Sequence, residues 1–455
     1  MPHSCVRRGT TLVLRVVAVL TAAFLLTAGS GAVPADRTPG GTSRLSPQVV
    51  HTGTGPTGYR VTFRYRDPGA DRVQIKGEWY FADPYELSAL TTDDGTALES
   101  PGTPPSRWQP GDIPLAHPNS PAANWPVVDM KKGHDGVWTY STPLPSGVFT
   151  YSFYVDCADD TQTTCAAVSD PANPPWNEKN GKVSGTTERT SQVYVPSDPS
   201  FGTVGHTEQG PSATGRHGKL THITYAAPTS VTPPGENYLS VYTPPGYDPG
   251  RTKPYPTLYL FSGDANEMDW STQGDAGHIL DNLIATGQVP PMVVVMPNTA
   301  GFPDSAGYAS FDQNLTDTLV PYVESRYRVS TAATDRAAAG LGYGASLTNS
   351  LLFGHTAEFG SYGVFSPGRR GTYTLPDASS LTGTQVAALR NARILVGGGW
   401  QDPSHDYHAD EVSLLTGLGV PVTPGFVNGG HSWSVWRLDL ADFLTRTAFF
   451  PPTAG

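Results

Sequence analysis

The sequence predicts a two-part chain, in which an all-β region precedes an α/β domain built on a mostly parallel sheet. Residues 49–196 hold short runs of β-forming residues between Gly, Pro and Asp turns and show no helical period. Residues 217–455 alternate apolar strand-like runs with helical stretches, which implies βαβ units covered on both faces. The length of 455 residues also suits two or three domains.

The first 35 residues are expected to be a secretory signal that is cleaved. Arg7, Arg8 and Arg15 precede the apolar run Val16–Leu26, and small residues follow it. The Arg7-Arg8 pair leaves twin-arginine export open beside the general secretory route. The run is shorter than the about 20 residues of a membrane span, and no later run reaches that length. We therefore expect a secreted, extracellular protein in which residues 36–48 form a disordered lead-in.

Charge and cysteine content limit the partners and the compartment. The formal net charge of -11 argues against a nucleic-acid binder, which needs clustered Lys and Arg, and favours a neutral or cationic partner such as a polysaccharide. Once Cys5 is lost with the signal, Cys157 and Cys165 remain as a pair separated by a polar loop. We predict a disulfide between them, with two free thiols or a two-cysteine metal site as alternatives.

The first half is expected to be a β-sandwich over residues 49–196, joined to the second half by a linker over residues 197–216. Its strand-like runs are Val61–Tyr65, Val73–Ile75, Trp138–Tyr140 and Val148–Val155, and a strand-like insert, Gln192–Val195, lies in the polar, Gly- and Ser-rich connection over residues 177–216. Five tryptophans of this half are interpreted either as core residues or as a sugar-stacking platform. These are Trp79, Trp108, Trp125, Trp138 and Trp176. The segments 147–156 and 170–174 resemble the end of an immunoglobulin-like early-set domain, a type that precedes many glucan-active enzymes and enterochelin esterases.

The second half shows the change of period that predicts a parallel sheet. Its strand-like runs are 257–261, 292–296, 336–339, 393–396 and 422–427, and its helical stretches are 279–286, 312–326 and 410–418. Ligands of such sheets bind beyond the carboxyl ends of the strands. The loops that follow these runs are therefore where a site is expected.

The run Gly340-Leu341-Gly342-Tyr343-Gly344 has the form of a strand-to-helix elbow that lacks its nucleophile. In the G-x-S-x-G elbow the outer glycines allow a sharp turn and the serine presents a hydroxyl. Here Gly342 occupies the serine position, so no acyl-enzyme can form at this residue. Ser346 lies four residues further along, where a helix-start hydroxyl is the simpler interpretation.

Short motifs of the second half occur in an order that resembles one enzyme family. They are 241–247, 259–263 with Trp270, 294–298, 319–324, 326–329, 336–344 and 429–433 with Trp436 and Arg437. From about residue 225 onward the chain resembles the enterochelin-esterase or esterase-D-like family, which includes feruloyl and acetylxylan esterases and mycolyltransferases. The resemblance implies an α/β-hydrolase fold and a secreted protein that acts on a carbohydrate or another esterified substrate.

The resemblance also implies a catalytic histidine and an acid. The family order along the chain is serine, acid, histidine. His431 matches the histidine in Gly-Gly-His-x-Trp, and Asp402 after the strand 394–396 matches the acid. Asp406 lies close enough in sequence to be an alternative acid.

The oxyanion loop departs from the family pattern. Family members have His-Gly and further glycines after the first central strand, whereas this chain has Ser262-Gly263-Asp264. A carboxylate at Asp264 would repel an oxyanion if it pointed inward. Gly263, Asp264 and Tyr343 are the oxyanion-loop candidates. Substrate-binding candidates are Trp270, Asn298, Trp400, Trp433 and Trp436.

Three functions remain open from the sequence. The first is a hydrolase that uses His431 and Asp402 to activate water in place of serine. The second is a catalytically inactive carbohydrate-binding protein of esterase fold. The third is a glycosidase that uses a carboxylate pair among the acidic loop residues. These are Asp264, Glu267, Asp269, Asp312 and Asp402.

No metal or organic cofactor is expected from the sequence. His405 and His408 with Asp402 or Asp406 form only a weak ligand-like cluster. The sequence also leaves the oligomeric state open.

Overall fold

The structure is a computed structural model of the 455-residue chain. It describes residues 44–86, 102–115, 125–158, 165–175, 184, 190–212, 214–263, 266–302, 308–367 and 373–449. The expected signal and lead-in up to residue 43, together with Trp176 and Asp264, lie outside the described residues. Residues 43–455 cluster as one compact unit, which the following paragraphs describe.

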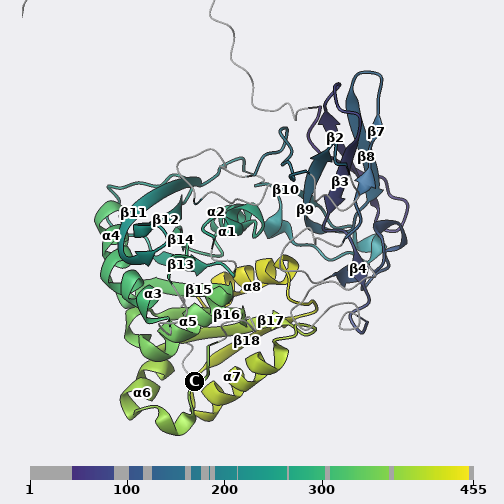
Figure 1. The fold of residues 1–455 in the computed structure, drawn as a ribbon. Helices are drawn as coiled ribbons and strands as arrows, with labels where there is room; N and C mark the ends of the chain where they lie inside the picture. Colours follow the sequence, from purple (N-terminus) through teal and green to yellow (C-terminus); the bar gives the residue numbers. More distant parts are fainter. Residues whose placement is uncertain are drawn as a thin grey trace, which may run out of the picture. The chain divides into compact units, whose positions relative to one another are not determined.

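The first half contains two antiparallel four-stranded sheets. One has the order β1 (Gln48–His51), β2 (Tyr59–Arg66), β8 (Val137–Pro143) and β7 (Lys131–Lys132). The other has the order β10 (Ser191–Val195), β9 (Gly147–Val155), β3 (Val73–Gly77) and β6 (Val128–Asp129), and β4 (Phe81–Ala82) pairs with β5 (Ile113–Pro114). Residues from both sheets share one apolar core, as in a sandwich (Figure 1). The strand-like runs predicted in this half all lie in strands.

The described tryptophans of this half belong to its core. The exposed fractions are 1% for Trp79, 5% for Trp108, 2% for Trp125 and 6% for Trp138. Their rings pack with residues of both sheets in the same apolar cluster. The structure therefore supports the core interpretation of these four residues rather than the sugar-stacking one.

The predicted disulfide between Cys157 and Cys165 is confirmed. The two Cα atoms lie 5.3 Å apart, within the range that the bond requires. Cys157 follows β9 directly, so the bridge closes the loop that leaves this strand.

The second half is built on an eight-stranded mixed sheet. Its order is β11 (Lys219–Val231), β12 (Pro234–Thr243), β14 (Val293–Pro297), β13 (Thr257–Phe261), β15 (Arg336–Gly342), β16 (Ser361–Pro367), β17 (Arg393–Gly399) and β18 (Val422–Val427). The strands from β14 to β18 run parallel, whereas β11 and β12 form an antiparallel hairpin at one edge. The prediction of a mostly parallel sheet is confirmed.

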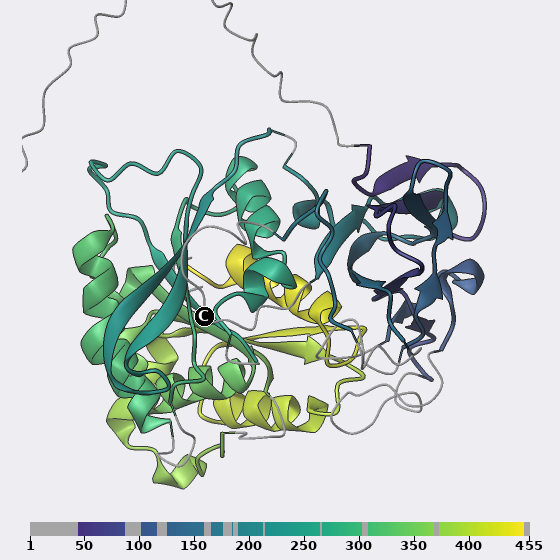
Figure 2. The same ribbon diagram turned by 45° about the horizontal axis from the view of Figure 1, so that its top comes forward.

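Helices cover both faces of this sheet, which explains why its central strands are buried along their whole length and are mostly apolar. One face carries α1 (Asp269–Thr272), α2 (Ala276–Ala285) and α8 (Trp433–Arg446). The other carries α3 (Ala309–Asn314), α4 (Val320–Arg326), α5 (Tyr343–Gly354), α6 (Gly383–Asn391) and α7 (His405–Gly417). Figure 2 shows α8 and α7 on opposite sides of β17 and β18.

The predicted helices lie where they were expected, with one irregularity. Between α3 and α4 the residues Leu315–Leu319 form a π-helical turn, so the stretch 312–326 is helical but not one regular α-helix. Among the described residues, no helix has the length and apolar character needed to cross a membrane.

Candidate active site

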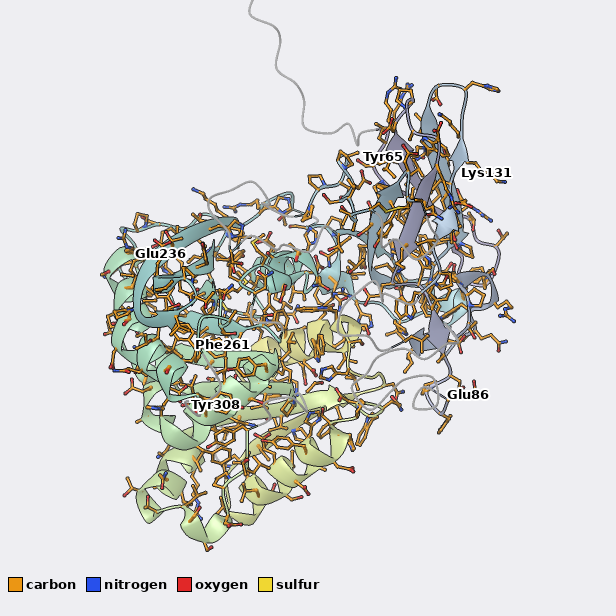
Figure 3. The ribbon with its side chains drawn as sticks, viewed as in Figure 1. Tyr65, Glu86, Lys131, Glu236, Phe261 and Tyr308 are labelled. Carbon is orange, nitrogen blue, oxygen red and sulfur yellow. A yellow bond between two sulfur atoms is a disulfide. The ribbon has the colours of Figure 1, made fainter. Side chains whose placement is uncertain are left out.

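The elbow expected at residues 340–344 is formed at the carboxyl end of β15. The strand ends at Gly342 and α5 begins at Tyr343. An added Cβ at Gly340 would lie 2.4 Å from the carbonyl oxygen of Gly344, and one at Gly344 would lie 2.7 Å from that of Phe261, which ends β13 and is labelled in Figure 3. Both outer positions therefore require glycine, because backbone atoms fill the space of any side chain.

Gly342 differs from its neighbours because there is room for a side chain. Its φ of 54° and ψ of -119° describe the sharp turn of the elbow. An added Cβ would lie 3.4 Å from the Cα of Gly263 and 4.0 Å from Nε2 of His431. A side chain at this position would therefore point toward the histidine.

His431 and Asp402 form a hydrogen-bonded pair beside the elbow. Nδ1 of His431 lies 3.1 Å from Oδ2 and 3.3 Å from Oδ1 of Asp402. The backbone N–H of Ser404 donates to Oδ1 at 2.8 Å, which fixes the carboxylate. The Asp402 side chain is fully buried and that of His431 is 13% exposed. Nε2 of His431 is thus the ring nitrogen on the side of Gly342.

Electrostatics keep Asp402 ionised despite its burial. Burial alone raises the pKa of this carboxyl, but the charge and hydrogen bond of His431 hold it below its usual range. The carboxylate can therefore orient the ring and stabilise an imidazolium. Asp406, the alternative acid, is exposed on α7.

Backbone hydrogen bonds join the loop of the acid to the loop of the histidine. The N–H of Trp400 donates to the carbonyl of Val427 at 2.8 Å, and that of Gln401 donates to the carbonyl of Gly429 at 3.0 Å. The Gly429 N–H in turn donates to Oε1 of Gln401 at 2.8 Å. The two loops are thereby held in a fixed relation to each other.

Of the three oxyanion-loop candidates, Gly263 and Tyr343 lie within the described residues and Asp264 does not. Gly263 packs over the elbow, since a Cβ added there would meet Leu341, and Tyr343 opens α5. The positive end of the α5 dipole therefore lies beside Gly342. Ser346 is fully buried, and its hydroxyl accepts a hydrogen bond from the Tyr373 N–H at 3.2 Å.

The acidic residues considered for a glycosidase are engaged in structural hydrogen bonds. Glu267 accepts from the N–H and the hydroxyl of Ser184 at 2.8 and 2.9 Å, and from Asn298 at 2.9 Å. Asp269 accepts from the Ser262 hydroxyl. All these side chains except Ser184 are buried, and Asn298 is only 6% exposed. Asp312, also buried, accepts from Ser350 at 2.7 Å.

Three of the four tryptophans predicted as stacking faces lie inside the core. Trp270, Trp433 and Trp436 are at most 2% exposed and pack edge to face, with ring centres 5.3 and 5.1 Å apart. The His431 ring contacts Trp436 at 5.0 Å. Their burial does not fit a sugar-stacking role, and Trp436 packs against the His431 ring instead. Trp400 is 52% exposed.

Arg437 is a residue whose role the sequence did not predict. It lies in α8, is 1% exposed and donates two hydrogen bonds to the carbonyl of Gln273 and one to the carbonyl of Val148 in β9. Its guanidinium also lies 3.7 Å from the buried carboxylate of Glu78. The helix that follows the His431 loop is thus tied to the first half of the chain.

The histidines of the weak ligand-like cluster act as packing rings. His408 is fully buried, stacks on Phe426 at 5.9 Å, and burial lowers its pKa to about 4. His405 contacts Trp400 at 5.0 Å. Within the part of the chain that the structure describes, no three His, Cys, Asp or Glu side chains are grouped so as to hold a metal ion.

A comparison with family models gives the family of the second half. Residues 230–447 match the model described as putative esterase. This part of the chain belongs to the esterase-like α/β-hydrolase family. We call residues 230–447 the esterase segment. It contains the elbow, the His431–Asp402 pair and most of the sheet that positions them.

Curated relatives of the esterase segment include hydrolases. The chain is 33% identical over 162 residues to an endo-1,4-β-xylanase/feruloyl esterase of Xylanibacter ruminicola, covering 33% of this chain and 22% of that protein. It is 29% identical over 248 residues to an esterase of Mycobacterium tuberculosis, covering 43% of this chain and 53% of that protein. The chain thus spans about half or less of the length of these relatives.

Among solved structures, the enterobactin esterase FES from Shigella flexneri matches both halves of the chain. The TM-score is 0.50 at 18% identity, over 89% of this chain and 96% of that one. At this identity the likeness supports the fold alone. The second half of the chain therefore has the α/β-hydrolase fold.

The esterase segment also buries a carboxyl group beneath the elbow helix. Glu411 in α7 is fully buried and accepts a hydrogen bond from Asn349 of α5 at 3.1 Å. Burial raises its pKa to about 8. Since an unfolded Glu has a pKa of about 4.3, the native state holds one more proton than the unfolded state between these values.

We expect Glu411→Gln to remove a pH dependence of stability. Because the native state binds the extra proton, the free energy of unfolding of the parent protein falls as pH rises from about 4.3 to 8, by up to about 1.4 kcal/mol per pH unit. Glutamine keeps the acceptor for Asn349 and cannot ionise. Urea unfolding at a series of pH values measures the slope, with exposed Glu86→Gln as the control. Equal slopes for Glu411→Gln and the parent protein would contradict a buried neutral carboxyl.

Proposed function

We propose that this chain hydrolyses a carboxylic ester by direct attack of water, with His431 as the general base. The observation that carries the proposal is the direction of His431, whose Nε2 lies 4.0 Å from the place where a Cβ at Gly342 would stand. A water molecule about 1 Å closer to the ring than that place would be within the hydrogen-bond reach of Nε2, about 2.6–3.2 Å. The position of this His431–Asp402 pair, called the dyad below, supports His431 as the base, and Gly342 leaves the place of the serine to water.

The proposed reaction forms no covalent bond between the protein and the acyl group. Nε2 of His431 takes a proton from water while the water oxygen bonds to the ester carbonyl carbon. Asp402, hydrogen-bonded to Nδ1, stabilises the imidazolium that results. The carbon–oxygen bond to the alcohol then breaks, and the imidazolium returns the proton to the leaving alkoxide. The products are the acid and the alcohol. The positive end of the α5 dipole stabilises the oxyanion of the tetrahedral intermediate, which forms when water adds to the carbonyl carbon.

We expect this reaction to be slow for an enzyme. Triad enzymes that lack a member retain rates about 10³ to 10⁴ above water through oxyanion stabilisation and binding. The dyad adds general-base catalysis, which contributes about 10² to 10⁴ in rate. Hydrolysis should therefore exceed the uncatalysed rate while remaining below that of a serine enzyme.

The proposed substrate is an ester of a carbohydrate or of another extracellular compound. The relative of Xylanibacter ruminicola is named for xylanase and feruloyl esterase activity. The expected signal over residues 1–35 supports an extracellular site of action. We also propose the boundaries 49–196 for an immunoglobulin-like sandwich, 197–216 for the linker and 217–455 for the esterase domain. The reaction uses no metal or cofactor.

His431→Ala tests the proposed base. We expect hydrolysis of aryl acetates and of feruloylated oligosaccharides to fall by about 10² to 10⁴, because no other group near Gly342 is proposed to take the proton. Product release measured by chromatography and mass detects the change. His134→Ala, an exposed histidine of the first half, is the matched control and should leave turnover unchanged. Turnover that survives His431→Ala would show that the dyad is not the base.

A catalytically inactive binding protein is the alternative function, and Gly342 itself favours it. A binder has no need of a nucleophile, and the rest of the pocket would hold the ester without turning it over. Binding of a feruloylated oligosaccharide without any product, in both the parent protein and His431→Ala, would support this alternative. The glycosidase hypothesis gains no support, because Glu267, Asp269 and Asp312 are held in structural hydrogen bonds and Asp402 is paired with His431.

A further inference from the structure

One sheet of the first half has a face that turns away from the sandwich core. Along β2, Val61 and Phe63 are core residues, so the residues that alternate with them point to the other side of the sheet. The antiparallel register extends this side to β1, β8 and β7. We call it the outer face: the even-numbered residues of β1 and β2 and the odd-numbered residues of β8 and β7.

The outer face is cationic and holds no acidic side chain. Arg60, Arg66 and Lys131 are exposed on it and Arg64 is partly exposed, and Lys131 is labelled in Figure 3. None of the positions of this face, all of which the structure describes, is Asp or Glu. The whole chain has 40 acidic and 29 basic residues and a net charge of -11, so the outer face reverses the sign of the molecule locally.

The four cations have no ion-pair partner among the described residues. The acids near them in sequence are engaged elsewhere, in the turns beyond one end of the face or on the other sheet. Asp67 accepts from the N–H groups of Gly69 and Ala70 at 3.0 Å, and Asp135 accepts from that of Val137 at 3.1 Å. Asp129 of β6 pairs with Arg72 at 2.7 Å. The charge of the outer face is therefore available to a ligand.

The cations are spread over the face as a ligand chain would require. Thr139 pairs with Arg64 on one side and with Lys131 on the other, so these residues form one row across three strands. With neighbouring strands about 4.7–4.9 Å apart, the Cα atoms of Arg64 and Lys131 are separated by about 10 Å. Arg60 and Arg66 are six residues apart on β2, a distance of about 20 Å. An extended polyanion can contact all four cations, whereas a single small anion cannot.

Hydroxyl groups lie among the cations of the outer face. Thr62 stands between Arg60 and Arg64 along β2, and its hydroxyl lies 2.7 Å from that of Ser141 on β8. Guanidinium groups bind carboxylates through two parallel hydrogen bonds, and hydroxyl groups can donate to or accept from sugar hydroxyls. The lining therefore suits a polymer that alternates carboxylates with hydroxyl groups.

We propose that the outer face binds an acidic polysaccharide, a polymer of sugars that carry carboxylates. Single-stranded nucleic acid is a poorer occupant, because it is bound through aromatic side chains, and an anionic membrane is poorer because it requires large apolar ones. The outer face has neither among its residues, all of which are described. The expected secretory signal also favours an extracellular polymer. This function is separate from ester hydrolysis, since no residue of the face belongs to the elbow or the dyad.

Binding of the full chain to immobilised polygalacturonate tests the proposal. We expect binding that weakens as salt is raised from about 50 to about 200 mM, because salt screens exposed charges. Carboxyl-reduced polygalacturonate keeps the sugar chain without its charge and should not bind measurably. The combined variant Arg60→Gln, Arg66→Gln and Lys131→Gln should weaken the Kd by about tenfold or more.

A matched variant separates the outer face from the net charge. Arg107→Gln, Arg216→Gln and Lys253→Gln remove the same charge from exposed positions elsewhere and should leave the Kd unchanged. Equal weakening by both combined variants overturns the proposal, as does equally tight binding of the reduced polymer. The three single variants on the outer face change exposed side chains and decide the matter if the combined variant does not fold.

Further outcomes identify the class of polymer and separate this proposal from the proposed hydrolysis. Binding of a DNA duplex or of phosphatidylglycerol vesicles as tightly as polygalacturonate, at the same concentration of anionic groups, overturns the assignment to a polysaccharide. Polygalacturonate binding that persists in His431→Ala supports the outer face whether or not esters are hydrolysed. Absence of any binding to polygalacturonate overturns the proposal and leaves the proposed hydrolysis untouched.

Discussion

Gly342→Ser is expected to convert a protein that a fluorophosphonate does not label into one that is labelled at residue 342. The serine Cβ would lie 4.0 Å from Nε2 of His431, and rotation about χ1 can bring its hydroxyl within hydrogen-bond distance of that nitrogen. Aryl ester hydrolysis should rise by about 10² or more, because loss of the serine from a triad costs far more than that. Gly342 has a positive φ of 54°. A residue other than glycine in such a conformation lowers the free energy of unfolding by about 1–3 kcal/mol, which a folded domain can sustain.

Two variants serve as controls for the regained nucleophile. Gly342→Ala introduces the same Cβ and the same backbone strain but no hydroxyl, so it should remain unlabelled. Gly342→Ser combined with His431→Ala retains the hydroxyl but lacks the base and should also remain unlabelled. A folded Gly342→Ser protein that neither reacts with the probe nor gains activity would show that His431 does not activate a hydroxyl group at residue 342.

Arg437→Met is expected to cause the largest loss of stability among the substitutions considered. The change removes the guanidinium that lies 3.7 Å from the buried carboxylate of Glu78, and it removes donors from the carbonyls of Gln273 and Val148. Breaking a buried pair by removing one partner costs about 3–5 kcal/mol. The free energy of unfolding, measured in urea, should fall by that amount, provided that the transition has two states.

A matched surface pair provides the control for Arg437. Arg446 in the same helix pairs with Asp442 but is 52% exposed, so Arg446→Met should cost no more than about 1 kcal/mol. Glu78→Gln combined with Arg437→Met should recover part of the loss, because it removes the buried negative charge that Arg437 faced. A cost of Arg437→Met similar to that of Arg446→Met would contradict the role of this contact between the two halves of the chain.

Much of the fold follows from sequence pattern. Apart from Thr257 and Arg393 at their starts, the runs 257–261 and 393–396 are apolar, and such runs between helical stretches occur in buried parallel strands. The pattern did not reveal β16, whose Ser, Gly and Pro residues weaken the strand signal although the strand is fully buried. Its position between β15 and β17 depends on pairing with neighbours, which a local window does not contain.

Sequence motifs predicted the residues of the candidate catalytic pair, but they did not predict which neighbouring side chains are buried. His431 and Asp402 follow strands at the carboxyl edge of the sheet, so their proximity was foreseeable from topology. The burial of Trp433 and Trp436 was not foreseeable, because an aromatic residue near a catalytic motif suits a pocket wall and a core equally well. The contact between Arg437 and Glu78 joins residues far apart in sequence, and no local pattern marks it.

The most direct test of the central claim is the mass of the intact protein, quenched while it hydrolyses an aryl acetate. If His431 activates water, the protein keeps its unmodified mass at every time point while product accumulates, and the accumulation depends on His431. An acetylated protein that forms and decays at the rate of product release would contradict the account, because it would identify a nucleophile other than water.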